Sequence, residues 1–166
     1  MRRLTVYKHQ SGNLNVNPKN SLNYMYYYKG PITVIRNFIL VWLSKYTPTL
    51  SLKRFLLRMT GMKIGKNVNL GLCAAFDIFF PELIEIGDNT IIGYNATLLA
   101  HEFLIDSFRT GRIVVGKNVM IGAGTTVLPG VQIGDGAVVS AMSLVNRDVP
   151  PGSFVGGIPA KQLRRK

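Results

Sequence analysis

Residues 115–146 read VGKNVM IGAGTT VLPGVQ IGDGAV VSAMSL VN, and an aliphatic residue opens each group of six. The same period runs from residue 64 to residue 150, where the first positions of twelve six-residue units are all apolar. Glycine takes the second position in seven of these units. Helices bury residues three or four apart and half-buried strands bury every second residue, so neither explains a period of six. The repeat therefore predicts a solenoid of stacked parallel strands, in which glycines let the backbone turn at the corners.

Three units are expected to make one triangular coil, and the sequence holds about four coils. They cover residues 64–81, 86–103, 115–132 and 133–150. The frame is interrupted by ELIE at 82–85 and by LIDSFRTGRIV at 104–114. Each insertion follows the third unit of a coil, so both should leave the prism from the same corner. Because insertions in a solenoid usually carry function, we expect a site at this corner.

The chain of 166 residues carries its excess positive charge near its N-terminus. Residues 1–61 contain ten Lys and Arg and no Asp or Glu, whereas residues 62–166 contain ten basic and eight acidic side chains. We therefore predict a basic arm with helices over 1–61 and a repeat domain with a short tail over 62–166. The basic part is expected to be a solvated surface, a contact with another subunit, or a surface that attracts an anionic partner such as a membrane. No nucleic-acid-binding motif is present, so nucleic acid is not expected as a partner.

Two helices are predicted between an irregular arm at 10–30 and the repeat. In the first, over 32–45, apolar residues recur at near-helical spacing and are expected to be buried: Ile32, Ile35, Phe38, Ile39, Trp42 and Leu43. Ser51 is expected to cap the second helix and Gly61 to end it. Its apolar stripe should pack inward and its basic residues should face away: Leu52, Phe55, Leu56 and Met59 against Lys53, Arg54 and Arg58. Packing against the chain is the expected role of both helices, with a membrane contact by the first as the alternative.

Several features favour a cytoplasmic protein. Cys73 is the only cysteine, so no intrachain disulfide forms and a reducing compartment is the default. The start, MRRLTVYKHQ, lacks the apolar segment of a signal peptide. The longest apolar run, ITVIRNFILVWL, is interrupted by Arg36 and Asn37 and is shorter than the roughly 20 residues that span a bilayer. Any membrane contact is expected to be peripheral, at the inner face.

The unit LLAHEF at 98–103 holds one of the two histidines of the chain, and the other is His9. His101 lies at the corner from which the insertions leave. A neutral imidazole, with an ordinary pKa near 6.5, accepts a proton from a hydroxyl or amine at neutral pH. His101 is therefore a candidate general base, and a structural histidine on a solenoid face is the alternative.

The stretches IGDNTIIGYNATLLAHEF and VVGKNVMIGAGTTVLPGVQIGDGAVVSAMSLVNRDVPPGSFVGGIPAK resemble the hexapeptide-repeat acyltransferases. The similarity covers about residues 51–161 and is closest to the maltose and galactoside O-acetyltransferases and the xenobiotic acetyltransferases. It implies a mainly β fold, a left-handed parallel β-helix that departs from the usual right-handed crossover. It also implies a homotrimer with sites at subunit interfaces, and His101 as general base in direct acetyl transfer. Handedness and trimerisation do not follow from the spacing itself.

Four further side chains are candidates around His101. Glu102 takes a position where nearly every other unit has a small or apolar residue. It is expected either to orient His101 or an acceptor amine, or to reach into solvent. Asp77 replaces a glycine in the coil below, on the same face as His101, and is a candidate for binding the acceptor or polarising the imidazole. Tyr94 and Asn95 lie one unit earlier and are candidates for acceptor binding or simple turn residues.

The resemblance implies acetyl-coenzyme A as the donor and no metal. A thin, amide-bearing pantetheine arm needs a groove of small side chains, which IGAGTT at 121–126 and VVSAMS at 138–143 provide. The residues expected to contact the coenzyme are Ala123, Gly124 and Ala141 along the arm, Asn146 and Arg147 near the nucleotide, and Lys161 and Arg164 at the phosphates. Met120 stands where many relatives have Trp, which changes the expected shape of the donor channel.

Other functions fit the sequence less well. A γ-type carbonic anhydrase needs three histidines on zinc, and this chain has two. An acyl-carrier-protein-dependent enzyme would suit the basic N-terminus, but the C-terminal repeats resemble members that use coenzyme A. A structural β-helix without activity is a further alternative. The expected acceptor is a hydroxyl of a sugar or a cell-envelope glycan precursor, with N-acetylation of a small amine or xenobiotic as the alternative.

Overall fold

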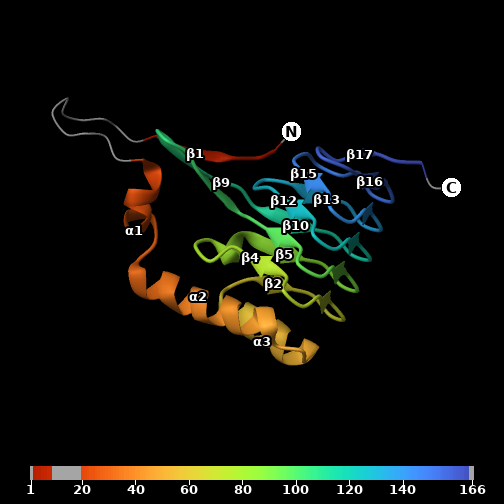
Figure 1. The fold of residues 1–166 in the computed structure, drawn as a ribbon, viewed down its shortest axis with the longest axis horizontal. Coiled ribbons are helices and arrows are strands. Elements are labelled where there is room, and N and C mark those ends of the chain that lie inside the picture. Colours follow the sequence, from red (N-terminus) through yellow and green to blue (C-terminus); the bar gives the residue numbers. More distant parts are fainter. Residues whose placement is uncertain (1, 9–19, 165–166) are drawn as a thin grey trace.

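The fold is a computed structural model that describes residues 2–8 and 20–164. Short strands stack in coils to form a prism, and helices α2 (Pro31–Tyr46) and α3 (Leu50–Met59) lie across one end of it (Figure 1). His9 lies outside the described residues. The mainly β, parallel architecture that the six-residue repeat predicts is confirmed. The left-handed winding and the number of coils stay predictions.

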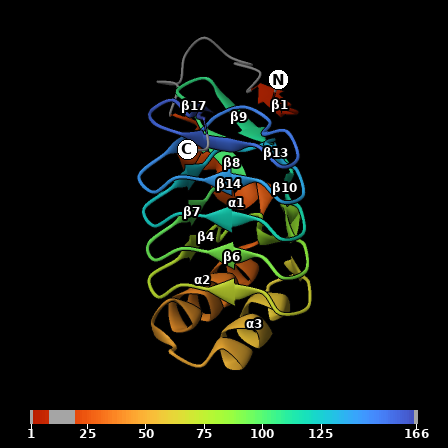
Figure 2. The same ribbon diagram turned by 90° about the vertical axis from the view of Figure 1, so that its right-hand side faces the viewer.

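Three sheets form the faces of the prism, and their repeat strands pair in parallel. The first sheet contains β2 (Lys63–Ile64), β5 (Ile84–Ile86), β10 (Ile113–Val115) and β13 (Gln132–Ile133). The second contains β3 (Asn69–Leu70), β6 (Ile91–Ile92), β11 (Met120–Ile121), β14 (Val138–Val139), β16 (Phe154–Gly156) and the antiparallel β17 (Lys161–Gln162). The third contains β4 (Ala75–Phe76), β7 (Thr97–Leu98), β12 (Thr126–Val127) and β15 (Leu144–Val145). Figure 2 shows the second sheet stacked above α2 and α3.

The apolar first positions of the repeat fill the centre of the prism. The register pairs Leu70 with Ile92, Ile92 with Ile121, and Ile121 with Val139, so equivalent side chains lie one above another. All twelve first positions belong to one buried cluster, and the most exposed of them, Ile64, has 8% of its surface accessible. The predicted inward stack of aliphatic side chains is confirmed.

The repeat glycines have a different role from the predicted one. A Cβ on Gly122 would lie 2.3 Å from the backbone nitrogen of Ala141, and a Cβ on Gly93 would lie 2.6 Å from that of Ala123. These glycines are therefore required because the backbone of the next coil passes so close. The left-handed backbone conformation occurs two residues later, at Asn95 (φ 54°) and Gly124 (φ 66°). The prediction that the repeat glycines make the turn was wrong.

The N-terminal helices differ from their predicted bounds. The arm predicted as irregular contains a 3₁₀ turn, η1 (Ser21–Tyr24), and a short helix, α1 (Met25–Tyr28). Helix α3 begins at Leu50 with Thr49 as N-cap, so the prediction of Ser51 as the cap was wrong. Gly61, with φ 96°, follows the end of α3 as predicted and donates its N–H to the Arg58 carbonyl at 2.9 Å.

The face of α3 that packs inward buries Lys53 and Leu57, and three basic side chains of the helix bond to the first coil. Lys53 is 2% exposed, and its Nζ donates to the carbonyls of Leu70 and Gly71 at 3.3 and 2.9 Å. Arg54 donates to the Val68 carbonyl and Arg58 to the Ile64 carbonyl, at 2.9 and 2.7 Å. Carbonyls of the later coils accept from backbone N–H groups of the coil before them, but no coil precedes the first one. The cationic side chains of α3 therefore donate to first-coil carbonyls that would otherwise lack a hydrogen-bond partner. The predicted inward apolar stripe was therefore wrong: Leu52, Phe55 and Met59 are about half exposed, and Leu56 is only partly buried.

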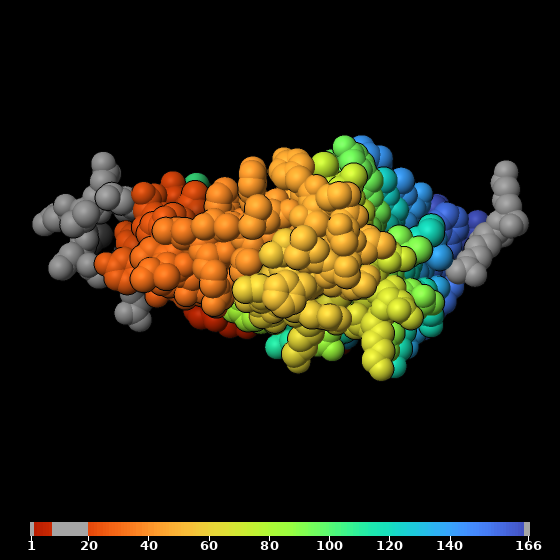
Figure 3. All heavy atoms as spheres, turned by 90° about the horizontal axis from the view of Figure 1, so that it is seen from below, coloured from red at the N-terminus to blue at the C-terminus, as the bar shows by residue number. Residues whose placement is uncertain are grey.

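In helix α2, too, the buried side is not the one that the sequence predicts. Its buried side consists of Val34, Asn37, Leu40, Val41 and Ser44, and Asn37 Nδ2 donates to the Ile78 carbonyl at 3.0 Å. The six residues predicted to be buried are 42–84% exposed. The sequence misleads because α2 is apolar on most of its circumference, and its two buried polar side chains, Asn37 and Ser44, bond to backbone carbonyls. Seen from below, the atoms of α2 and α3 cover this end of the prism (Figure 3).

Both insertions leave from the corner between the third and first sheets, as predicted. The first contains a 3₁₀ turn, η2 (Pro81–Leu83). The second is an antiparallel hairpin of β8 (His101–Phe103) and β9 (Ser107–Thr110), and the N-terminal strand β1 (Thr5–Lys8) pairs with β9. We call this the insertion corner. The division at residues 61 and 62 stays a prediction, and Val41 and Leu57 share the core of the prism.

Candidate active site

His101 is positioned at the insertion corner by the first residue of β8. Its Nδ1 lies 2.5 Å from Asp77 Oδ2, and the two side chains are 14% and 0% exposed. Asp77 directly follows β4 in the coil below, where the repeat otherwise favours glycine. The structure thus brings together two candidates that lie 24 residues apart in the sequence.

The Asp77 carboxylate is held by backbone groups as well as by His101. Its Oδ1 accepts from the N–H groups of Phe79 and Phe80 at 2.8 and 2.9 Å, and its Oδ2 accepts from that of Ala100 at 2.8 Å. Burial by itself raises the pKa of this carboxyl. The hydrogen bond and charge of His101 and the amides of Phe80 and Ala100 outweigh burial, so the pKa of Asp77 is lowered. Asp77 is therefore an ionised acceptor at neutral pH.

This arrangement fixes the tautomer of the imidazole. An ionised carboxylate can only accept, so His101 Nδ1 carries the proton and Nε2 keeps a lone pair. An imidazole oriented in this way by a buried carboxylate is the arrangement that accepts a proton from a nucleophile in triad hydrolases. The pair can therefore act as a base through Nε2.

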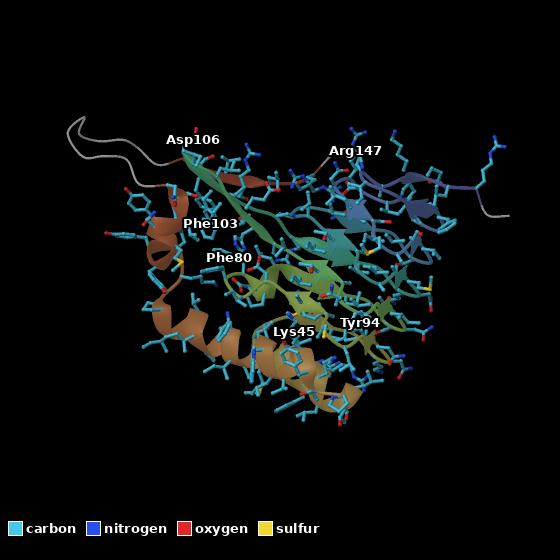
Figure 4. All side chains as sticks on the ribbon, viewed as in Figure 1. Lys45, Phe80, Tyr94, Phe103, Asp106 and Arg147 are labelled. Carbon is cyan, nitrogen blue, oxygen red and sulfur yellow. The ribbon has the colours of Figure 1, made fainter. Side chains whose placement is uncertain are left out.

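Phenylalanine rings surround the imidazole. The ring centroids of Phe79 and Phe103 lie 5.0 and 4.8 Å from that of His101, both edge-on. Phe80 and Phe108 lie at 6.0 and 6.4 Å (Figure 4 labels Phe80 and Phe103). These rings keep water from one side of the imidazole. The repeat pattern does not indicate these rings, although the pair FF at 79–80, two residues after Asp77, is a signal in the sequence.

Glu102 points away from the imidazole. Residues alternate sides along a strand, so Glu102 shares the opposite side of the hairpin with its register partner Arg109. Its carboxylate lies 2.5 Å from Arg2 Nη1 and 4.0 Å from Arg109 Nη1. The structure therefore places Glu102 in an ion-pair cluster that ties the N-terminal segment to the hairpin.

The candidates for the pantetheine arm lie at another corner, where the second sheet passes into the third. Gly124 N donates to the Tyr94 carbonyl and Met142 N to the Ala123 carbonyl, each at 2.8 Å. Tyr94, Asn95, Ala123, Gly124 and Ala141 thus form one column of neighbouring coils, which we call the small-residue corner. Figure 4 shows Tyr94 well apart from Phe80 and Phe103. One chain therefore does not bring His101 and the small-residue corner together.

The candidates for contacts with the nucleotide and phosphates of the coenzyme lie in two places. Asn146 and Arg147 follow β15 at the insertion corner and line a cavity of about 470 Å³ together with Arg2 and Leu4. Asn146 Oδ1 is buried there without a hydrogen-bond partner. Lys161 begins β17 and Arg164 follows it; both are exposed, at the end of the prism away from the helices (Figure 1). Within residues 2–8 and 20–164, no cluster of three or more His, Cys, Asp or Glu could hold a metal ion.

Comparison with known proteins identifies the family. The model of the bacterial transferase hexapeptide, with six repeats, matches residues 112–147. A Bacillus subtilis (strain 168) protein named "Putative acetyltransferase YvoF" is 50% identical over 152 residues, which are 91% of this chain and 88% of the relative. A Staphylococcus aureus (strain N315) protein designated in the same way is 42% identical over 135 residues, covering 80% of this chain and 84% of the relative. This chain belongs to the hexapeptide-repeat acyltransferase family.

Solved structures of hexapeptide-repeat acyltransferases have the same fold. A Vibrio cholerae acetyltransferase complexed with acetyl-coenzyme A superimposes with a TM-score of 0.70 at 23% identity, covering 86% of this chain and 96% of the other. A galactoside acetyltransferase in complex with coenzyme A gives 0.63 at 22% identity, covering 81% and 80%. The family and the class of enzyme predicted from the sequence are thereby confirmed.

Proposed function

We propose that this protein transfers an acetyl group from acetyl-coenzyme A to a hydroxyl of a sugar or a cell-envelope glycan precursor, with His101 as the general base. The observation that carries the proposal is the contact between His101 Nδ1 and the buried Asp77 carboxylate, which leaves Nε2 as a proton acceptor. The acetyl-coenzyme A complex of the Vibrio cholerae relative supports the donor.

The proposed reaction needs no covalent enzyme intermediate. His101 Nε2 takes the proton of the acceptor hydroxyl as its oxygen bonds to the thioester carbonyl carbon. The tetrahedral intermediate then collapses, the carbon–sulfur bond breaks, and the thiolate of coenzyme A takes the proton from Nε2–H. The products are the acetyl ester and free coenzyme A, and the imidazole returns to its starting state. Asp77 acts as a positioning residue and stabilises the imidazolium that forms.

We further propose that the working unit is a homotrimer with sites between subunits. His101 and the small-residue corner lie at different corners of one prism, and a neighbouring copy would supply the corner that each lacks. In this arrangement Ala123, Gly124 and Ala141 of one subunit face His101 of the next. Arg2 and Arg147 line the cavity at the insertion corner and offer two cations for the coenzyme phosphates. Lys161 and Arg164 are proposed as further phosphate partners.

A sugar-type acceptor is supported by the galactoside acetyltransferase and by a maltose O-acetyltransferase of Clostridium difficile. The latter has a TM-score of 0.58 at 21% identity and covers 90% of this chain and 98% of the other. Tyr94 is 58% exposed at the small-residue corner, where its ring is available to pack against a sugar, and Asn95 follows it. In the alternative, N-acetylation of a small amine, Glu102 would offer a carboxylate, but Arg2 already pairs with it.

The decisive experiment presents labelled acetyl-coenzyme A and the full chain with a panel of sugars, glycan precursors and small amines. We expect label in a hydroxyl-bearing acceptor and release of the label by mild alkali, which cleaves esters and leaves amides intact. Label that survives alkali would show that the acceptor is an amine and not a hydroxyl. A protein that neither releases coenzyme A nor gains thermal stability from millimolar acetyl-coenzyme A would be an inactive β-helix.

A further inference from the structure

An apolar surface covers the helical end of the prism. Of the 24 large apolar side chains that are exposed among the described residues, eleven belong to α2 and α3. Ile35, Phe38, Trp42 and Tyr46 of α2 and Leu52 and Phe55 of α3 are each 48–58% exposed. We call the exposed apolar side chains of these two helices the helical end face.

The helical end face points away from the prism. The opposite sides of both helices pack on the first coil, through Asn37 on Ile78 and Lys53 on Leu70 and Gly71. Figure 3 looks directly at this end and shows the side chains of α2 and α3 gathered there. Eleven half-exposed side chains of this size present an area on the order of 1,000 Å², whereas soluble monomers rarely expose more than a few hundred Å² in one patch. A surface of this size is typical of a binding site for a partner.

The charges beside this surface are positive. Residues 20–66 contain eight Lys and Arg and no Asp or Glu. Arg36, Lys63 and Lys66 are exposed at or next to the helices. Three carboxylates also lie beside the helices, and each has a basic residue as its neighbour: Glu82 pairs with Lys29 at 2.5 Å, Glu85 lies 3.8 Å from both Lys63 and Arg112, and Asp88 accepts from the backbone N–H of Lys66 at 2.7 Å.

We propose that the helical end face binds the surface of an anionic lipid bilayer. An apolar stripe with Trp and Tyr beside exposed cations is typical of helices that lie in the headgroup region. No described helix is long and apolar enough to cross a membrane, and α2, with 16 residues, is suited to lie flat. Face-to-face packing of two copies would bring together two surfaces on which cations outnumber carboxylates, which disfavours self-association. The sides of the prism, with His101, stay accessible when this end rests on lipid.

The single tryptophan reports on this contact directly. Trp42 is the only Trp of the chain and is 53% exposed on the helical end face. We expect its emission to shift to the blue when the full chain meets vesicles of phosphatidylcholine and phosphatidylglycerol, and the protein to float with them. Raising the salt from about 0.1 M to about 1 M shortens the screening length from about 10 Å to about 3 Å and should weaken binding at least about tenfold. Vesicles of phosphatidylcholine alone should bind correspondingly less.

Matched variants separate this surface from other exposed apolar residues. Phe38→Asp combined with Phe55→Asp should abolish flotation and the blue shift, with thermal unfolding and acetyl-coenzyme A binding retained. Ile105→Asp replaces an equally apolar side chain, 81% exposed in the turn of the β8–β9 hairpin, and should float like the wild type.

Two results would overturn the proposal. One is the absence of both flotation and blue shift at low salt. The other is a blue shift that follows protein concentration without vesicles, with a doubled mass in sedimentation, which would make a second copy the partner. Neither result bears on acetyl transfer, because the proposal does not depend on the reaction.

Discussion

At the scale of single residues, the account rests on Asp77 and His101. The buried carboxylate is satisfied by three backbone N–H groups and the imidazole, so its charge persists in a site that would otherwise favour the neutral acid. Its two oxygens fix both the orientation and the tautomer of His101. This explains why an aspartate stands at a second position of the repeat, where glycine is the most frequent residue.

The lowered pKa of Asp77 predicts how stability depends on pH. The ionised form is favoured by folding, so Asp77 contributes stability above its unfolded pKa of about 3.9 and loses that contribution as pH falls through its lower folded pKa. Asp77→Asn should therefore lower the melting temperature at pH 7 and lose less stability than the wild type between about pH 5 and pH 2. Thermal unfolding across this range, with the exposed Asp106→Asn as control, measures the difference. Parallel acid profiles for Asp77→Asn and the wild type would contradict the assignment.

The sequence predicted the neighbourhood of Asp77 and His101 better than it predicted the contacts of the residues around them. Counting in sixes places Asp77 and His101 on one face because the coil length fixes which residues stack. Glu102 could not be placed by counting, since the hairpin that begins at His101 leaves the repeat and turns Glu102 toward Arg2. Arg2 itself is 100 residues away in the sequence, and nothing local in the sequence indicates its contact.

At the scale of elements, the repeat is governed by the distance between coils. The aliphatic first position repeats so regularly that the twelve inward side chains could be predicted one by one. The helices could not, because a helix apolar on most of its circumference does not reveal which side packs inward. The orientation of α3 is set by the unpaired carbonyls of the first coil, which accept hydrogen bonds from Lys53 and Arg58. This requirement arises only in the folded chain.

Gly122→Ala tests the role of close approach between coils. The added Cβ would lie 2.3 Å from the backbone nitrogen of Ala141, so the coils must separate, and we expect a loss of about 1–3 kcal/mol or more in the free energy of unfolding. Gly30→Ala is the matched control, because nothing lies within 4 Å of a Cβ added at this position and the φ of Gly30, −57°, suits alanine. Its effect should stay within about 0.5 kcal/mol in denaturant unfolding. Equal losses in the two variants would show that contact with the next coil is not the cause.

At the scale of the whole molecule, the separation of the two corners predicts shared sites. His101→Ala and Ala141→Trp should each inactivate the protein, the first by removing the base and the second by filling the small-residue corner. If sites lie between subunits of a trimer, every trimer that contains both variants has one intact site of its three and should regain about a third of the wild-type activity. Co-expression with two different tags and isolation of doubly tagged assemblies measures it. Mixed assemblies without activity would place both parts of the site in one chain.

The most direct test of the account compares the two histidines of the chain. We predict that His101→Ala lowers kcat/KM for acetyl transfer by roughly 10²–10⁴-fold, the usual contribution of a general base, while acetyl-coenzyme A still raises the melting temperature. His9→Ala should leave turnover unchanged. A His101→Ala variant that folds, binds the donor and transfers acetyl at the wild-type rate would contradict the central claim that this imidazole removes the acceptor's proton.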